Sequence, residues 1–212
     1  MPPRARTRAL HVTRYVRTGA PKLGGPARAN ATGPEIFTLM KSITNAPSGQ
    51  LGCAPSMRDR AVDLARMGFR VFKLKVGDKT PDVSKPYDVA SSDPGVVHRV
   101  WTNPVNGESV DNNIGVACGN GLMVLDVDVK NGKPGMQSLE FLEDMGLPID
   151  GLRVRTPSGG IHVYLEVPPD THIPNSVEKI AAGVDVRGHH GYVVGAGSVV
   201  GGIEYVFVGG VR

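Results

Sequence analysis

Residues 122–129 read Leu-Met-Val-Leu-Asp-Val-Asp-Val, and this stretch is the strongest indicator of the fold. Its apolar residues predict a strand, in which successive side chains point to opposite faces. Asp126 and Asp128 then share one face, while the apolar residues between and around them face the core. Aspartate is unfavourable inside strands, so two in one apolar strand indicate a function. Carboxylate oxygens suit Mg²⁺ or Mn²⁺, which makes a metal site one interpretation; a solvated pair on an edge strand is the other.

The segments around this strand predict helices mixed with antiparallel strands. Apolar spacing and capping residues, such as Asp93 before Pro94, indicate helices over 58–67, 94–101 and 136–145. Further strands are expected at 70–76, 113–118, 152–156, 161–167, 183–187, 191–195 and 203–208. The Gly-Asn-Gly turn at 119–121 predicts that strands 113–118 and 122–129 pair as a hairpin. The mixture indicates an α+β fold.

The basic character of the chain comes from its first part. Seven Arg and Lys residues precede the first acidic residue, Glu35, so the net charge of +4 leaves −3 for the remainder. Residues 1–56 also show little hydrophobic periodicity, which predicts a disordered basic leader; a nucleic-acid tether and a transit peptide are the alternatives. The folded domain is expected over 57–212. The total charge gives no argument for a basic nucleic-acid surface on that domain.

Composition excludes several classes of protein. No run of about 18 apolar residues appears and the N-terminus has no apolar signal core, so neither a membrane span nor secretion is expected. A cytoplasmic location is therefore predicted. Cys53 and Cys118 do not form a CxxC pair, which excludes a Cys-rich zinc site. A Walker A motif is absent from the sequence.

The turn at 155–162 combines polar side chains with Pro and Gly. Backbone amides in such a turn suit a phosphate, and Ser158 adds a hydroxyl. His162 returns on the following strand, and Arg155 is a candidate for binding a triphosphate. A simple hairpin turn with an exposed histidine is the alternative.

A second charged pair lies in the apolar stretch 183–188. Asp185 and Arg187 share a strand face by the same alternation. One interpretation is a structural ion pair. The other is a third metal-binding carboxylate with an arginine that faces the nucleotide phosphates.

From about Met57 to Phe207 the order of these segments resembles the bifunctional primase-polymerase (prim-pol) domain of the archaeo-eukaryotic primase superfamily. That family occurs on phages, plasmids and integrated elements. Each short motif is weak alone, and the resemblance lies in their order and spacing: Arg70-Val-Phe-Lys-Leu74, Lys85-Pro86, Ala90-Ser-Ser-Asp93, Trp101, Asn113-Ile-Gly-Val116, Leu125-Asp-Val-Asp128, Arg155-Thr-Pro-Ser-Gly-Gly-Ile-His162, Gly183-Val-Asp-Val-Arg-Gly188, Gly191-Tyr-Val-Val194 and Gly197-Ser198.

The resemblance implies a role for each polar residue. Asp126, Asp128 and Asp185 match the family's metal-binding catalytic acids, and His162 matches its nucleotide-contacting histidine, with Ser158 beside the phosphates. The implied fold is an RRM-like antiparallel sheet joined to a second small α/β unit, with the active site in the cleft between them.

The predicted function is template-directed nucleotidyl transfer, as a DNA primase and/or DNA polymerase. Two Mg²⁺ or Mn²⁺ ions would assist it, with Arg187 and, less centrally, Arg155 on the nucleotide phosphates. Its partners would be a single-stranded DNA template, with loop lysines such as Lys79 and Lys85 as candidate contacts, and dNTP and/or NTP. Many members of the family continue into a helicase domain, so the resemblance also implies a separate replicative helicase as a possible partner. Two alternatives stay open: a catalytically inactive, primase-like replication-initiator module that binds nucleic acid, and a metal-dependent nuclease or phosphatase.

Overall fold

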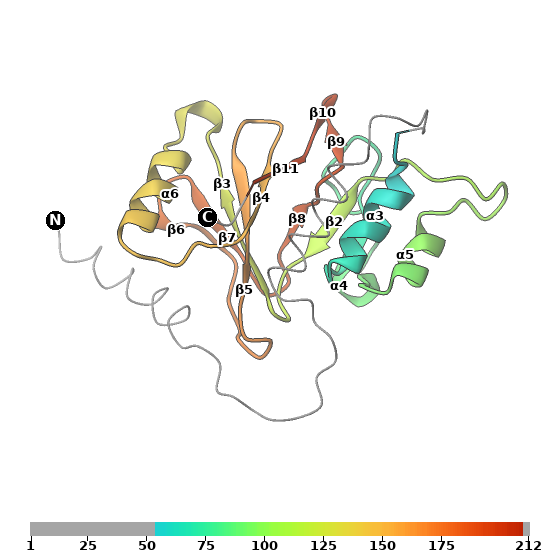
Figure 1. The fold of residues 1–212 in the computed structure, drawn as a ribbon, viewed down its shortest axis with the longest axis horizontal. Coiled ribbons are helices and arrows are strands. Elements are labelled where there is room, and N and C mark those ends of the chain that lie inside the picture. The colour runs from blue at the N-terminus through green and yellow to red at the C-terminus, as the bar shows by residue number, and fades with distance from the viewer. Residues whose placement is uncertain (1–53, 210–212) are drawn as a thin grey trace.

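A six-stranded antiparallel sheet runs through the middle of the computed structural model, which describes residues 54–209 (Figure 1). Its strands lie in the order β11 (Val206–Val208), β4 (Leu152–Arg155), β5 (Ile161–Glu166), β3 (Leu122–Val127), β7 (Val184–Arg187) and β6 (Ser176–Ala181). The acidic strand β3 therefore has a neighbour on each side. All but the end of the predicted leader lies outside the described residues.

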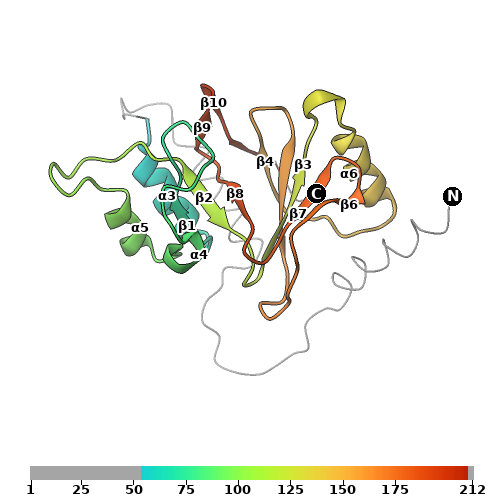
Figure 2. The same ribbon diagram turned by 180° about the vertical axis from the view of Figure 1, so that it is seen from behind.

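A smaller unit packs against one face of this sheet. It contains a three-stranded antiparallel sheet with the order β1 (Val71–Lys73), β2 (Ile114–Ala117) and β8 (Tyr192–Val194). Its helices are α3 (Met57–Arg66), α4 (Pro86–Val89) and α5 (Pro94–Val100). Figures 1 and 2 place these helices at one end of the molecule and α6 (Gly135–Asp144) at the other. The mixture of helices and antiparallel sheets confirms the predicted α+β class.

The alternation along β3 separates two hydrophobic cores. Leu125 and Val127 are buried in one core, where they join Leu139 and Leu142 of α6. Val124 points to the opposite face and belongs to the other core, between the six-stranded sheet and the smaller unit. The predicted division of β3 into two faces is therefore confirmed, and Asp126 lies on the face toward the smaller unit.

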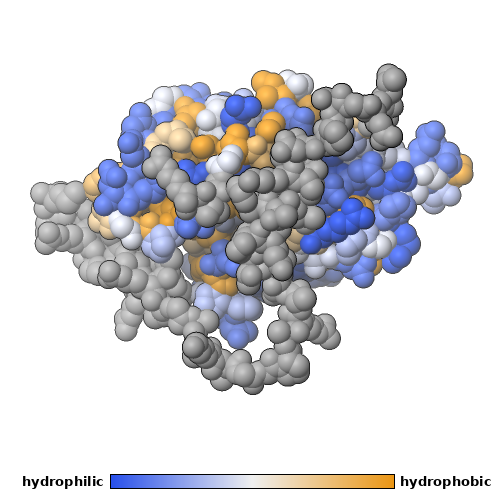
Figure 3. Space-filling model, viewed as in Figure 1, coloured by the Kyte–Doolittle hydropathy of each residue, from blue (hydrophilic) through white to orange (hydrophobic). Residues whose placement is uncertain are grey.

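Two helices of the smaller unit begin at side-chain caps. Ser56 and Asp59 bond reciprocally to each other's backbone N–H at the start of α3, which satisfies donors that the helix leaves free. Asp93 accepts bonds from the N–H groups of Gly95 and Val96, with Pro94 in the first turn of α5, as predicted. Figure 3 shows a mainly hydrophilic surface over α3 and α5, so their apolar faces turn inward.

The predicted hairpin between residues 113–118 and 122–129 is wrong. β2 pairs with β1 and β8, whereas β3 pairs with β5 and β7. A single bridge between Gly119 and Leu122 remains. Gly119, Asn120 and Gly121 all have positive φ, so the turn redirects the chain from one sheet into the other. Each strand is largely buried and has two neighbours in its own sheet, which leaves no edge for the hairpin.

Other boundaries differ for local reasons. β1 is shorter than the predicted strand at 70–76, and α4 was not among the predicted helices. The short η1 (Lys130–Gly132) follows β3, and residues 203–208 divide into β10 (Ile203–Glu204) and β11, with buried Tyr205 between them. β10 pairs with β9 (Val199–Val200). β6 was not predicted because it is an edge strand in which apolar and polar residues do not alternate and half of the side chains are exposed. No helix within 54–209 is long and apolar enough to cross a membrane.

Gly135, at the start of α6, packs closely against the backbone that follows the acidic strand, and a substitution there tests this packing. A Cβ at this position would overlap the carbonyl oxygen of Asp128 and lie 2.8 Å from that of Gly183. We predict that Gly135→Ala lowers the free energy of unfolding by about 1–3 kcal/mol, since the backbone must shift. Urea denaturation measures this. Glu140→Ala on the exposed face of the same helix should change stability by less than about 0.5 kcal/mol, and equal effects would contradict the packing argument.

Candidate active site

Three polar residues form a row across the centre of the six-stranded sheet. Asp126 on β3 lies directly opposite His162 on β5 and directly opposite Asp185 on β7. Residues in register on antiparallel neighbours point to the same face, so the three side chains gather there. Segments that are far apart in the sequence thus bring these residues together on the face toward the smaller unit.

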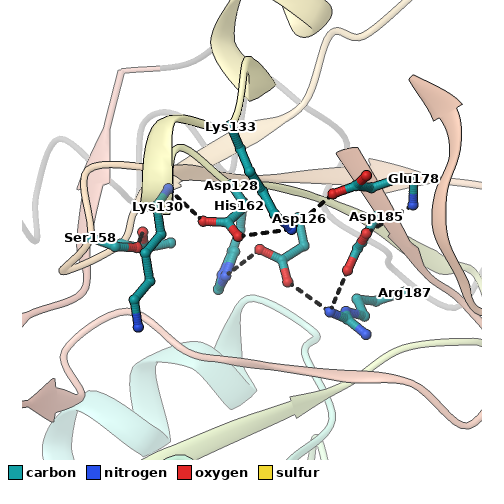
Figure 4. Close-up of polar contacts among 10 residues, drawn as sticks. Asp126, Asp128, Lys130, Lys133, Ser158, His162, Glu178, Asp185 and Arg187 are labelled. Carbon is teal, nitrogen blue, oxygen red and sulfur yellow. Dashed lines mark hydrogen bonds and ion pairs between the residues drawn. The ribbon is translucent and has the colours of Figure 1, made fainter. Parts of the chain in front are cut away.

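Arg187 links the two carboxylates of this row. Its Nη2 donates to Asp126 Oδ2 over 3.1 Å and to Asp185 Oδ2 over 2.9 Å (Figure 4). The predicted same-face pair of Asp185 and Arg187 is therefore present. Two carboxylates at neighbouring positions repel each other, and the guanidinium between them offsets that repulsion.

Asp128 lies just beyond the strand rather than within it, because β3 ends at Val127. Its N–H donates to the carbonyl of Gly183 over 2.8 Å, which keeps this residue beside β7. Its carboxylate accepts the N–H of Lys130 at 2.9 Å and lies 3.4 Å from the ammonium of Lys133. The Lys130 N–H in particular, together with the Lys133 charge, lowers the pKa of Asp128 below its usual value.

Glu178 is a fourth acid that the sequence analysis missed. It lies in the irregular part of β6, with a positive φ of 47° that is uncommon for residues other than glycine. Its N–H donates to Asp185 Oδ1 over 3.0 Å, and its carboxylate lies 2.8 Å from the Lys133 ammonium. The backbone at Glu178 thus orients Asp185, and Lys133 joins Glu178 to Asp128 (Figure 4). An exposed edge strand carries no sequence signal for this role.

His162 is buried, with 5% of its surface exposed. Its Nε2 lies 3.5 Å from Asp126 Oδ1, and its Nδ1 has no hydrogen-bond partner within 54–209. Burial lowers its pKa to about 4, although the negative charge of Asp126 opposes the shift. The side chain is therefore neutral near pH 7 and acts as a hydrogen-bonding group. The alternative of an exposed turn histidine does not hold.

A cavity of about 570 Å³ lies between the two sheets and collects most of the predicted site residues. Its lining includes Asp126, Asp128, Ser158, His162, Asp185 and Arg187. Tyr192 and Val194 of β8 and Lys79 line it from the smaller unit. A space of this size suits a small-molecule ligand.

The β4–β5 turn places Ser158 at the cavity. The N–H of Thr156 donates to the carbonyl of Gly160, and the Thr156 and Ser158 hydroxyls lie 3.1 Å apart. A Cβ on Gly160 would overlap the carbonyl of Val127, so glycine lets the turn lie against the end of β3.

Arg155 is not brought to the cavity. It alternates with Val154, which belongs to the core on the side of the smaller unit, and it is exposed. Arg153, on the same face as Arg155, pairs with Glu143 of α6. Arg155 therefore lies on the far side of the sheet from the acids.

A family model of the bifunctional DNA primase/polymerase N-terminal domain matches residues 61–212, well over half of the chain. The chain belongs to this family. No curated protein matches the chain. Membership supports a DNA primase/polymerase type of function, which is a nucleotidyltransferase type of activity.

The acids of this primase/polymerase domain are bonded to cationic side chains. Within residues 54–209, no three His, Cys, Asp or Glu side chains are grouped as an ion would require. Arg187 instead lies between Asp126 and Asp185, and Lys133 between Asp128 and Glu178. Asp126, Asp128 and Asp185 thus share one cavity, and in the described part of the chain cationic side chains lie beside them.

The buried His162 predicts a pH dependence of stability. Its pKa is about 4 in the folded chain and about 6.5 in the unfolded chain. Between these values only the unfolded chain binds the proton. The contribution of His162 to the stability of the fold is therefore complete above pH 6.5 and is lost as the pH falls toward 4. As the pH falls through this window, we expect the His162→Gln variant to lose about 2–3 kcal/mol less of its free energy of unfolding than the wild-type chain loses. Urea denaturation from pH 7 to pH 4 measures it.

The exposed His98 of α5 provides the control. His98→Gln should keep the slope of the wild-type chain across the same window. An unchanged slope in His162→Gln would show that this histidine is not held neutral by burial.

Proposed function

We propose that the chain catalyses template-directed nucleotidyl transfer, as a DNA primase and/or DNA polymerase, using Mg²⁺ or Mn²⁺ held by Asp126, Asp128 and Asp185. The observation that carries the proposal is the cross-strand pair of Asp126 and Asp185, with Asp128 beside it, at one nucleotide-sized cavity. Family membership supports the same reaction.

The residues fit divalent cations. Asp126 and Asp185 both bond to one guanidinium, which shows that the space between them favours a positive charge. Asp128 likewise has an ammonium beside it. Hard carboxylate oxygens are the ligands that Mg²⁺ and Mn²⁺ prefer. When bound, two such ions lower the pKa of an attacking hydroxyl and neutralise the charge of the triphosphate and leaving pyrophosphate.

The other side chains of the cavity would bind and orient the nucleotide. Arg187, once other cations neutralise the acids, is free to donate to phosphate oxygens. Ser158 offers a hydroxyl, and neutral His162 offers a ring nitrogen. His162 also lies against Asp126, so it helps to orient that carboxylate. We leave Arg155 out of the nucleotide site because it lies on the other face of the sheet.

We assign the cavity to the cleft between an RRM-like sheet, represented by the six-stranded sheet, and the second unit of a primase core. The substrates would be a single-stranded DNA template and dNTP and/or NTP, with a separate helicase as a partner. The proposed setting is replication of a phage, plasmid or integrated element in the cytoplasm of a bacterial cell.

Removal of two acids tests the proposal. We expect Asp126→Ala with Asp128→Ala to reduce nucleotide incorporation by at least about a thousandfold, because the ions lose most of their ligands. The assay uses a single-stranded template with and without a primer, Mg²⁺ or Mn²⁺, and labelled dNTP or NTP. Circular dichroism checks that the double variant is folded. Asp111→Ala with Asp170→Ala removes two exposed acids outside the cavity and should leave synthesis unchanged.

The outcomes separate the competing functions. Undiminished synthesis by the Asp126 and Asp128 variant would overturn the site assignment. A wild-type chain that binds single-stranded DNA but incorporates no nucleotide with either metal would indicate a replication-initiator module. Release of mononucleotides from labelled DNA without added nucleotides would indicate a nuclease.

The Arg187→Met variant tests whether the guanidinium occupies the position that a divalent metal ion would take. Without divalent metal, the variant leaves Asp126 and Asp185 opposed, and we expect the free energy of unfolding to fall by about 1–2 kcal/mol, since these side chains are partly exposed. Added Mg²⁺ or Mn²⁺ should stabilise the variant more than the wild-type chain. Urea denaturation with and without metal measures both effects.

Arg153→Met is the matched control, because it breaks the ion pair with Glu143 on the opposite face of the sheet. It should lose stability but respond to metal as the wild-type chain does. A metal response of Arg187→Met equal to that of this control would show that metal and guanidinium do not compete.

A further inference from the structure

Lys79 brings a positive charge to the cavity from the smaller unit. It lies in the loop between β1 and α4, and its side chain is part of the cavity lining together with Asp126, His162 and Asp185 of the six-stranded sheet. Burial raises the pKa of the Tyr205 hydroxyl, which also lines the cavity, and the ammonium of Lys79 opposes that shift. The side chain thus reaches between the two sheets.

The loop that carries Lys79 is held by several hydrogen bonds. The side chain of Asp78 accepts the N–H groups of Lys79 and Thr80. Asn113 donates to the carbonyl of Asp78 over 3.0 Å, and the Tyr192 hydroxyl donates to the carbonyl of Lys79 over 3.3 Å. These bonds tie the backbone of Lys79 to β8 and to the residue before β2. The lysine is therefore positioned at its base without a ligand.

The charges of the cavity are not equally available to a ligand. Arg187 is bonded to Asp126 and Asp185. Within residues 54–209, no carboxylate lies within 4.0 Å of the ammonium of Lys79. Lys130 also lines the cavity, but it extends from the segment of Asp128, beside the acids. Lys79 is thus the available cation that approaches from the other sheet.

We propose that Lys79 binds the triphosphate of the incoming nucleoside triphosphate. The inference rests on the proposed function and deepens it. A lysine is a compact charge with three donors, which suits non-bridging phosphate oxygens. A single strand would instead need a groove with several cations along its path, whereas this cavity is small and has few. Phosphates between Lys79 and the ion-binding acids would have positive charge on both sides.

Binding measurements on the full chain test this assignment. Isothermal titration calorimetry with dATP and ATP in the presence of Mg²⁺ compares the wild-type chain with Lys79→Met, Lys79→Arg and Lys75→Met. Loss of a charge-assisted bond should weaken triphosphate binding by about tenfold or more in Lys79→Met, and Lys79→Arg should restore most of the affinity. Lys75 is an exposed lysine of the same loop outside the cavity, so Lys75→Met should match the wild-type chain.

Two further ligands distinguish the phosphates of a nucleoside triphosphate from those of a DNA strand. Binding of the nucleoside deoxyadenosine, which has no phosphate, should be equal in Lys79→Met and the wild-type chain. Binding of a single-stranded oligonucleotide without dATP should also be equal. The proposal would be overturned if Lys79→Met bound dATP as tightly as Lys75→Met does. Weaker oligonucleotide binding by Lys79→Met with unchanged dATP binding would also overturn it, and would assign Lys79 to the template strand.

The same proteins distinguish this inference from the proposed function. A wild-type chain that binds dATP through Lys79 but incorporates no nucleotide would sink the proposed reaction and leave the triphosphate site standing. A wild-type chain that incorporates nucleotides, with a KM for dATP that Lys79→Met does not change, would sink only the assignment of Lys79.

Discussion

The position of Asp126 at the centre of the six-stranded sheet is the constraint on which the rest of the structure depends. A carboxylate on a central strand is costly unless its oxygens have partners. His162 and Arg187 provide them from the two neighbouring strands. The other face of β3 carries Leu125 and Val127 in a core with α6. One face of β3 thus packs in the core, and the other carries Asp126 at the cavity.

The charges around Asp126 are balanced in two linked groups. Arg187 bonds to Asp126 and Asp185, while Lys133 lies between Asp128 and Glu178. The N–H of Glu178 joins the groups because it bonds to Asp185. The cations of the protein therefore hold the acids together without metal. In the proposed reaction, exchange of these cations for divalent ions would release Arg187 to the nucleotide, and metal binding would then be coupled to the binding of phosphate.

The tight turn at Gly119–Gly121 creates the cavity by separating β2 from β3. Because the two strands enter different sheets, the acidic face of β3 meets β8 and the Lys79 loop of the smaller unit. A hairpin would have placed β2 beside β3 in one sheet, in the place of β5 or β7. Either His162 or the pair of Asp185 and Arg187 would then have been separated from Asp126.

The sequence by itself determined the features that depend on near neighbours in the chain. The alternation at 122–129 predicted the two faces of β3, and the capping residues predicted the start of α5. It also identified six side chains that the structure brings to one cavity. Only the tertiary structure decided which strands flank β3, that Arg155 faces away, and that the backbone of Glu178 bonds to Asp185. The reason is physical: pairing between distant strands sets the register, and a period of two residues then decides which face each side chain joins.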